Sequence, residues 1–372
     1  MYKIFNIGLL GYGHVGRAAV KMLDELSNTR PVKLVKIFDT EEKKELIGPR
    51  FVSSVDAISE DPNIDIVIEA LGGNAFPFET IKVALKRGKH VVTSNKTVVS
   101  AHLQELLRLA HVNNCYFQFE ACCKVGIPLI KPLIELTKCD KITGLFGMLN
   151  TATNLMMSLI SSGTDINTAI REVIGEHISE RDVHIDLAGI DLARKLSILS
   201  SLAFKSQFDP LKIVRFGLEN LDETILKAIG ENRTLRLIGE ADLSEENNLV
   251  HIHVMPAIFS KNDPRIIISK ESNSYLEIKT ANCGMISLSG VSSGAEGASS
   301  SICGDVIRIL ESSGYIENVD LHNYQVSGYE NTPYNYLVKD KSGKLSILKE
   351  QDIDLATSKF VARIIDDSFR TL

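Results

Sequence analysis

The sequence predicts an α/β protein with a doubly wound parallel-sheet domain and an α+β domain whose sheet is mixed or antiparallel. Short apolar strands alternate with helical patterns over residues 3–120, which is typical of parallel strands joined by crossover helices. Between residues 234 and 290, strand-like segments follow one another instead, and this clustering favours antiparallel pairs. A length of 372 residues is enough for two such domains.

The first strand leads into a glycine motif. The apolar strand 3–10 is followed by Gly11-Tyr12-Gly13-His14-Val15-Gly16, and a helical pattern then continues to Leu26. A second apolar strand, 32–38, ends in Asp39. This order of strand, G-x-G-x-x-G, helix, strand and acid predicts a Rossmann unit that binds a dinucleotide.

Each glycine of the motif is required at its position for a physical reason. Gly11 allows the tight turn, Gly13 lets the backbone approach the pyrophosphate, and Gly16 lets the helix pack close to the strand. The free N–H groups at the start of the helix, around His14 and Val15, stabilise the phosphate charge. We therefore expect these five residues to bind the cofactor.

Asp39 bears on which dinucleotide is bound. An acid at this position accepts hydrogen bonds from the ribose hydroxyls and repels a 2′-phosphate, so it favours NAD. Lys43 and Lys44 follow closely, and their charges leave NADP open.

The alternation of strands and helices continues along the first domain. Strands are expected at 64–70, 90–93 and 116–120, and helices at 78–87 and 101–111. Lys96 follows Thr93 and Ser94 just beyond the carboxyl end of a strand, where open parallel sheets bind their ligands, so Thr93 and Ser94 are expected to bind the cofactor. This lysine is either a solvated loop charge or a residue of the cofactor site.

The segment from Glu180 to Lys195 combines a helical pattern with charges. Apolar residues repeat at helical spacing and predict one helix over 187–204. Asp191 and Lys195 are four residues apart, so they share one face of that helix. By itself the pair is either a surface ion pair or part of a site.

The elements of the second domain are predicted from the pattern of apolar residues. Strands are expected at 141–148, 234–238, 249–255, 265–269, 275–279 and 285–290, and helices at 154–162, 165–174 and 298–311. The helix 298–311 is expected to return to the first domain. His251 and His253 point to one face of a strand, but no third metal ligand accompanies them.

Composition excludes several classes of protein. A net charge of −6 means that the chain has no overall excess of positive charge with which to bind nucleic acid or an anionic membrane. No apolar run approaches the roughly 20 residues that span a bilayer. The six cysteines have no zinc-type spacing, and together these features favour a protein of the reducing cytoplasm.

The chain resembles the homoserine dehydrogenases over residues 3–310. The similar stretches are GLLGYGHVG (8–16), GKHVVTSNK (88–96), FEACCKVGIPLI (119–130), GMLNTATN (147–154), DLAGIDLARKLSILSSLAF (186–204) and GDVIRIL (304–310). The resemblance implies a substrate-binding and dimerising second domain, a homodimer or higher homo-oligomer, and a place in threonine and methionine biosynthesis. The implied reaction is the reversible oxidation of L-homoserine to L-aspartate 4-semialdehyde.

The resemblance also implies roles for particular residues. Lys195 and Lys96 match the two lysines of the family, and Glu180 and Asp191 match its acids. Lys195 is expected to exchange the hydroxyl proton as general acid and base, with Lys96 at the oxygen or the nicotinamide. The two acids would hold the substrate ammonium and orient the lysines. Gly294 matches a glycine near the cofactor.

The family can hold a monovalent cation with backbone carbonyl groups. The positions that match this loop are Glu120, Cys123, Val125 and Ile127. Lys124 lies within the same loop and makes a cation less favourable there.

The chain departs from the family around the substrate pocket. Thr151 replaces a glycine, Val183 a proline and His177 a glycine, and Ser292-Ser293-Gly294 replaces glycine-alanine-glycine. Such changes alter backbone freedom or volume, so we expect homoserine to be a poor substrate. The alternatives are the same chemistry on another small hydroxy or amino acid, or a catalytically weak dinucleotide-binding regulator.

These features give the expected domain boundaries. Residues 1–135 form the dinucleotide-binding domain, 136–297 the substrate domain and 312–372 a C-terminal extension. The stretch 334–343 faintly resembles the opening of an ACT regulatory domain, but too few residues follow for a whole one. The extension is therefore interpreted as a remnant or an independent cap.

Overall fold

The structure is a computed structural model, and it describes residues 3–175, 183–291, 294–312, 322–330 and 332–369. The chain divides into two compact units. Unit 1 comprises Met1–Glu135 and Ser293–Leu321, and unit 2 comprises Leu136–Ser292 and His322–Leu372. Each unit is described by itself below.

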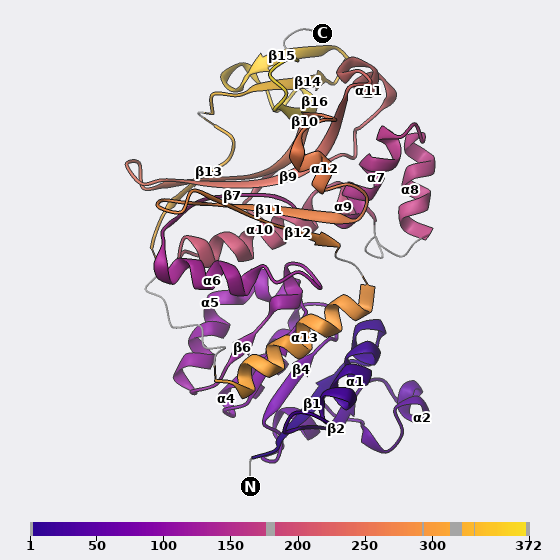
Figure 1. Cartoon of the computed structure of the whole chain (residues 1–372), viewed down its shortest axis with the longest axis vertical. Helices are drawn as coiled ribbons and strands as arrows, with labels where there is room; N and C mark the ends of the chain where they lie inside the picture. Colours follow the sequence, from indigo (N-terminus) through magenta and orange to yellow (C-terminus); the bar gives the residue numbers. More distant parts are fainter. Residues whose placement is uncertain (1–2, 176–182, 292–293, 313–321, 331, 370–372) are drawn as a thin grey trace. The chain divides into compact units, whose positions relative to one another are not determined.

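Unit 1 is built on a six-stranded parallel sheet (Figure 1). Its strand order is β3-β2-β1-β4-β5-β6, so the chain winds outward in both directions from β1. The strands are β1 (Phe5–Leu10), β2 (Val32–Phe38), β3 (Phe51–Val52), β4 (Ile66–Glu69), β5 (His90–Thr93) and β6 (Phe117–Gln118). The helices are α1 (His14–Leu26), α2 (Lys44–Ile47), α3 (Asp56–Ser59), α4 (Ala75–Lys86), α5 (Lys96–Val112), α6 (Ile130–Cys139), which continues into unit 2, and α13 (Gly294–Leu310).

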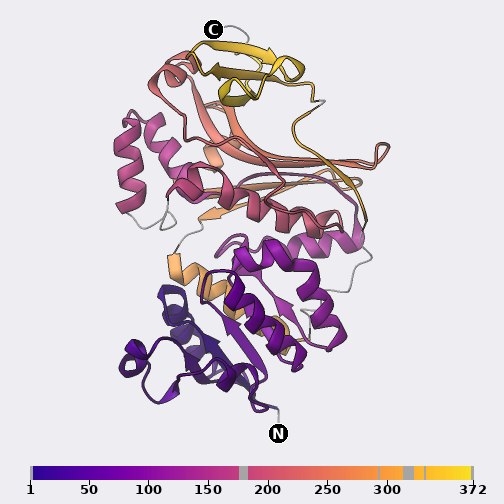
Figure 2. The same cartoon turned by 180° about the vertical axis from the view of Figure 1, so that it is seen from behind.

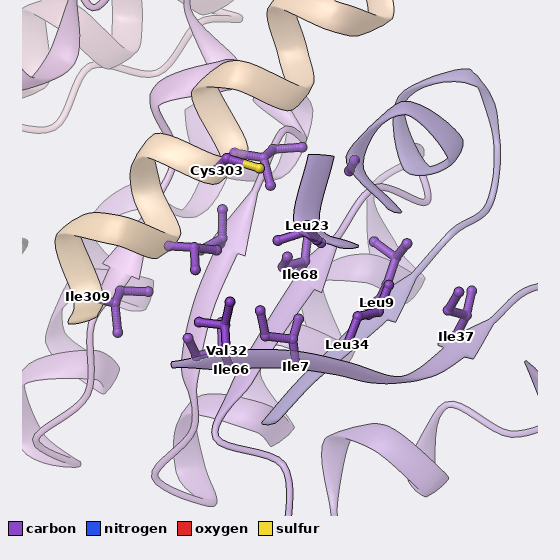
Figure 3. Close-up of a cluster of buried hydrophobic side chains, with 14 of the residues drawn as sticks. Ile7, Leu9, Leu23, Val32, Leu34, Ile37, Ile66, Ile68, Cys303 and Ile309 are labelled. Carbon is purple, nitrogen blue, oxygen red and sulfur yellow. The ribbon is translucent and has the colours of Figure 1, made fainter. Parts of the chain in front are cut away.

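The core of unit 1 explains why α13 belongs to it. Ile7 and Ile68 from the central strands are fully buried, and Leu23 of α1 packs against them (Figure 3). Cys303 and Ile309 of α13 complete the same cluster. The helix thus buries its apolar face on α1 and the sheet, 160 residues or more along the chain from them.

Unit 2 is built on a mixed sheet, which confirms the predicted fold class. The strand order is β12-β11-β7-β9-β10-β16-β14-β15, with β8 and β13 also paired to β10. Pairs are antiparallel, except that β8, β13 and β16 run parallel to β10. The strands are β7 (Ile142–Met148), β8 (Val214–Arg215), β9 (Arg233–Ser244), β10 (Leu249–Ser260), β11 (Asn273–Thr280), β12 (Met285–Val291), β13 (Gln325–Ser327), β14 (Asn335–Asp340), β15 (Leu345–Lys349) and β16 (Ser358–Ile364).

Unit 2 also contains helices. They are α7 (Thr151–Ser161), α8 (Ile166–Gly175), α9 (Val183–Leu187), α10 (Ile190–Ala203), α11 (Glu223–Ile229) and α12 (Pro264–Ile268). Helices α7 and α10 pack on β9, the strand at the middle of the sheet. Gly239 of β9 makes room for this packing, because a Cβ there would lie 3.3 Å from Leu196 of α10.

Three local expectations differ from the structure. The helix expected over 187–204 is α10, which begins only at Ile190, because Gly189 has φ +70° and separates it from the short helix α9. Residues 265–268 are not in a strand but in helix α12, where Pro264 occupies the first turn and Asp263 accepts from the backbone N of Arg265 at 2.9 Å. The helix expected from residue 101 already begins at Lys96.

The C-terminal segment differs from the expected remnant or cap. Its strands β13, β14, β15 and β16 are part of the sheet of unit 2, and β13 and β16 pair with β10. Figure 2 shows the last of these strands in yellow at the top. Tyr336 and Leu337 of β14 are fully buried, so this segment contributes to the core of the unit.

Candidate active site

The glycine turn of unit 1 has the geometry that a dinucleotide requires. Gly11 has φ +101°, and a Cβ there would lie 2.5 Å from the carbonyl oxygen of Ala70. A Cβ on Gly16 would lie 2.0 Å from the carbonyl oxygen of Gly11, so α1 could not approach the strand. Gly13 has open space beside it and caps α1 without a side-chain hydrogen bond. The first N–H groups of α1, from His14 and Val15, are thus available to a phosphate.

Asp39 lies at the end of β2 beside this turn and is held by three donors. Its oxygens accept from the backbone N of Tyr12 at 2.5 Å, from the backbone N of Thr40 at 2.7 Å and from Lys43 Nζ at 2.9 Å. Burial raises the pKa of this carboxyl, but these bonds outweigh it and hold the pKa below its usual value. Asp39 is therefore ionised at neutral pH, with a lysine at its side.

Thr93, Ser94 and Lys96 lie where β5 gives way to α5. Thr93 ends the strand, and Lys96 is the first residue of the helix. Asn95 caps this helix, because its Oδ1 accepts from the backbone N of Val98 at 3.2 Å. Sequence reasoning missed Glu69, a fully buried acid at the end of β4 that accepts from Thr93 Oγ1 at 2.5 Å. An acid that ends an apolar strand just before Gly72-Gly73 was the available signal.

The structure places the other predicted residues of unit 1 as follows. Gly294 begins α13 with φ +87°. Glu120 accepts from the backbone N atoms of Leu129 and Ile130 at 2.7 and 2.8 Å, so its carboxylate stabilises the start of α6. Cys123, Val125 and Ile127 follow in the loop between them, and Lys124 in this loop is buried.

Unit 2 brings together two acids, a lysine and an asparagine. Lys195 Nζ lies 2.7 Å from Asp191 Oδ2 and donates to the carbonyl oxygen of Leu149 at 2.9 Å. Asn150 Nδ2 donates to Asp186 Oδ1 at 2.7 Å and to Asp191 Oδ2 at 2.9 Å. The pair Asp191–Lys195 is therefore not a solvated surface pair, since all four of these polar side chains are buried.

Local structure fixes this group, which we call the Asn150–Lys195 cluster (Asn150, Asp186, Asp191 and Lys195). Asn150 caps α7, and its Oδ1 accepts from the backbone N of Thr153 at 2.8 Å. Asp186 and Asp191 stand on either side of the break at Gly189, so the break brings both acids to one amide group. Sequence reasoning missed Asn150 and Asp186, although both lie in stretches that carried the resemblance.

Two of the predicted residues, Glu180 and His177, lie outside the described residues. His253 is buried with Nε2 3.5 Å from Glu240 Oε2, and burial lowers its pKa to about 3. Within the described ranges, no three His, Cys, Asp or Glu residues are grouped to hold a metal ion. Within the same ranges, no helix combines the length and apolar character that a membrane crossing needs.

A dinucleotide turn in a parallel-sheet unit and a buried acid–lysine cluster on a second unit define an NAD(P)-dependent oxidoreductase. Two family models match the chain, "Homoserine dehydrogenase, NAD binding domain" over residues 11–120 and "Homoserine dehydrogenase" over residues 128–307. The homoserine dehydrogenase of Lactococcus lactis is 30% identical over 327 residues, which are 82% of this chain and 74% of that protein. The chain belongs to the homoserine dehydrogenase family.

Solved structures agree in fold. A homoserine dehydrogenase from Thiobacillus denitrificans superposes with a TM-score of 0.84 at 21% identity, covering 97% of this chain and 98% of that one. A hyperthermophilic archaeal homoserine dehydrogenase in complex with NADPH superposes with a TM-score of 0.72 at 25% identity, covering 85% of this chain and 99% of that one. The match to the first extends over nearly the whole chain, so the fold of both units is that of the family.

Proposed function

We propose that the chain catalyses the reversible, NAD(P)-linked oxidation of L-homoserine to L-aspartate 4-semialdehyde. The observation that carries this proposal is the Asn150–Lys195 cluster, in which the amide of Asn150 donates to two buried carboxylates and one of these, Asp191, pairs with the buried Lys195. A buried arrangement of this kind suits a substrate with one group that loses a proton and one that carries a positive charge.

The residues of the chain divide the reaction between them. The bound dinucleotide supplies the hydride acceptor at the nicotinamide ring. In its neutral amine form Lys195 takes the proton of the substrate hydroxyl as the carbon loses hydride, and so becomes the ammonium. In the reverse direction this ammonium returns the proton to the oxygen. Asp191 and Glu180 bind the substrate ammonium and orient Lys195. Lys96 acts at the substrate oxygen or at the nicotinamide.

The preferred cofactor is NAD, with NADP as the weaker one. Asp39 is ionised and lies where a ribose hydroxyl would be bound, so it repels a 2′-phosphate. Lys43 at 2.9 Å offsets part of this repulsion, and this pairing supports a moderate rather than an absolute preference.

Turnover measurements test the proposed reaction. Homoserine is assayed with NAD and with NADP, against a panel of small hydroxy amino acids. The expectation of a poor homoserine substrate stays a prediction. One finding opposes it: Thr151 is the first residue of helix α7 and has no positive φ, so its backbone does not require a glycine. Homoserine turnover within the usual range of about 1–1000 per second would contradict the poor-substrate prediction.

The same assay separates the alternatives. Turnover of another hydroxy amino acid in place of homoserine would favour the same chemistry on a different substrate. Binding of NAD without turnover of any member of the panel would contradict the enzymatic proposal and favour a regulator.

A monovalent cation in the loop 120–127 is a further proposal. The carboxylate of Glu120 is occupied by the N–H groups of α6, so a cation would depend on backbone carbonyl groups of Glu120, Cys123, Val125 and Ile127. The buried Lys124 opposes it. Thermal stability and turnover are compared in sodium, potassium and choline chloride at equal ionic strength. Equal values in all three salts would count against the cation.

We also propose a homodimer in the cytoplasm. The strand β12 lies at an edge of the sheet of unit 2, and Met285 and Val291 on it are 60% and 69% exposed. Exposed edge strands with apolar side chains favour association. Light scattering during gel filtration should give twice the mass of 41.0 kDa, and a monomer at micromolar concentration would exclude the dimer. All six cysteines are free thiols, which agrees with a reducing compartment.

A further inference from the structure

Glu69 is a buried carboxyl that the proposed reaction does not use. It is the last residue of β4 and fully buried, although the rest of this strand is apolar. Removing a carboxylate from water costs several kcal/mol unless its oxygens accept hydrogen bonds. Burial accordingly raises the pKa of Glu69, and hydrogen bonds from Thr93, Leu71, Asn95 and Gly72 oppose that rise.

All of these donors come from two turns. Glu69 Oε1 accepts from the backbone N of Leu71 at 2.8 Å and from Asn95 Nδ2 at 3.5 Å. Glu69 Oε2 accepts from Thr93 Oγ1 at 2.5 Å. Glu69 and Thr93 stand opposite each other in the last rung between β4 and β5. One carboxylate therefore binds the turn after β4 (residues 71–73) and the turn after β5 (residues 93–96).

A second layer of bonds extends this connection to Lys96. Thr93 Oγ1 accepts from the backbone N of Asn95 at 3.0 Å. Asn95 Nδ2 donates to the carbonyl oxygen of Gly73 at 3.0 Å, while its Oδ1 caps α5. Lys96 follows immediately as the first residue of α5. The direction in which its backbone enters the helix is thus set by bonds that end at Glu69.

The turn after β4 is hydrogen-bonded to Glu69 and Asn95, while its two glycines face open space. Gly72 and Gly73 have φ +76° and +83°, which other residues rarely adopt, and a Cβ on either would meet no atom within 4 Å. This edge of a parallel sheet is where ligands bind. We propose that Glu69 is a positioning residue, which joins the turns 71–73 and 93–96 and thereby holds Lys96 in place for the reaction. The proposal rests on the proposed function.

Two variants test this role. Thr93→Val removes the hydroxyl between Glu69 and Asn95 without changing the charge, and Glu69→Gln removes the charge with little change of shape. We expect kcat for homoserine to fall about 10- to 100-fold in both, because small misplacements of a reacting group have effects of this size. The dissociation constant of NAD should change less than about threefold, since the altered side chains are fully buried and the glycine turn is untouched. The deuterium isotope effect on hydride transfer should be at least as large as in the parent.

Thr80→Val is the matched control. Thr80 is a buried threonine of α4 whose hydroxyl donates to the carbonyl oxygen of Phe76 at 2.9 Å, away from both turns. Its kcat and isotope effect should equal those of the parent. Rates are expressed per NAD-binding molecule, so that a loss of folded protein does not imitate a catalytic effect. If Glu69→Gln does not fold, Thr93→Val still tests the connection.

The outcomes separate this inference from the proposed function. A parent protein that binds NAD but oxidises no homoserine contradicts the proposed function alone. In that case the fluorescence of bound NADH is compared between Thr93→Val and the parent, to test whether the two turns depend on Thr93. Identical spectra would overturn the positioning role. Where the parent is active, variants that are less stable but have unchanged kcat per folded molecule would show that Glu69 serves stability only.

Discussion

Lys195 combines burial with two fixed partners. Its Nζ atom lies 2.7 Å from Asp191 and 2.9 Å from the carbonyl oxygen of Leu149, so the orientation of the side chain is fixed. A side chain held in this way can meet a substrate hydroxyl without first being ordered, which lowers the entropic cost of the reaction.

We predict that Lys195→Ala lowers homoserine turnover about 100-fold or more, the scale of a lost general acid and base. NAD binding should persist, because the glycine turn belongs to the other unit. The exposed Lys212→Ala is the matched control and should behave as the parent. Steady-state kinetics and NAD titration provide the measurements. A variant within a few-fold of the parent would remove Lys195 from the mechanism.

In the proposed preference for NAD, Asp39 and Lys43 act against each other. We predict that Asp39→Ala weakens NAD and strengthens NADP relative to the parent, because ribose hydrogen bonds and repulsion of the 2′-phosphate are lost together. Lys43→Ala should shift the preference in the opposite direction, since it leaves the carboxylate of Asp39 without its cation. The ratio of kcat/KM for the two cofactors measures both effects. Tighter binding of NADP than NAD by the parent would refute the assignment.

At the level of elements, the break between α9 and α10 organises the Asn150–Lys195 cluster. Gly189 has a left-handed backbone, and a Cβ there would lie 2.8 Å from Val254 Cγ1. We predict that Gly189→Ala lowers the free energy of unfolding by about 1–3 kcal/mol. Turnover should also fall, because Asp186 and Asp191 flank the break.

A glycine within α13 provides the matched control for that substitution. Gly304 lies in the helix, and a Cβ there would meet no atom within 4 Å. Gly304→Ala should therefore raise stability by about 0.5–1 kcal/mol. Urea denaturation of both variants gives the comparison. Equal effects of the two substitutions would show that the left-handed backbone at Gly189 does not determine the loss of stability.

The contact of α13 with the loop after β6 should give stability a dependence on pH. Asp305 of α13 accepts from the backbone N of Glu120 at 3.0 Å and pairs with Arg308. Burial raises the pKa of Asp305 to about 7 from an ordinary value of 3.8, although Arg308 opposes this rise. Between these two values the folded chain holds a proton that the unfolded chain has released. The contribution of Asp305 to stability is therefore full below the lower value and is lost as the pH rises towards 7.

Asp305→Asn removes this titration. The stability of the variant relative to the parent should increase as the pH rises from 4 to 7, with a slope approaching about 1.4 kcal/mol per pH unit. Urea denaturation at several pH values within this range provides the measurement. Parallel stability curves for the two proteins would contradict the assignment.

At the level of the whole molecule, strands β13 to β16 complete the sheet of unit 2. Leu337 of β14 and Val361 of β16 are buried in it, and β16 pairs with β10. We predict that Leu337→Ala costs about 2–5 kcal/mol of stability, the usual range for a buried leucine. A chain that ends at residue 321 should give insoluble or partly unfolded protein. A truncated chain with the melting temperature of the parent would restore the interpretation as an independent cap.

The sequence by itself determined the features that depend on neighbours along the chain. The Rossmann unit follows from alternating strands and helices and from the glycine motif at the first turn, and β2 and β5 begin and end where the pattern predicted. The pair Asp191–Lys195 follows from helical spacing. In each case the physical cause lies within a few residues of its effect.

Tertiary structure decided the rest. The pattern placed the start of a helix at Leu187 and not at Ile190, because the apolar repeat continues across the break at Gly189. A short apolar run such as 265–269 suits a strand as well as a helix. Whether Asp191 is solvated depends on Asn150, some 40 residues away, and the function of Glu69 depends on Thr93 in the neighbouring strand. Such bonds join residues that are distant in the chain, and only the fold brings them together.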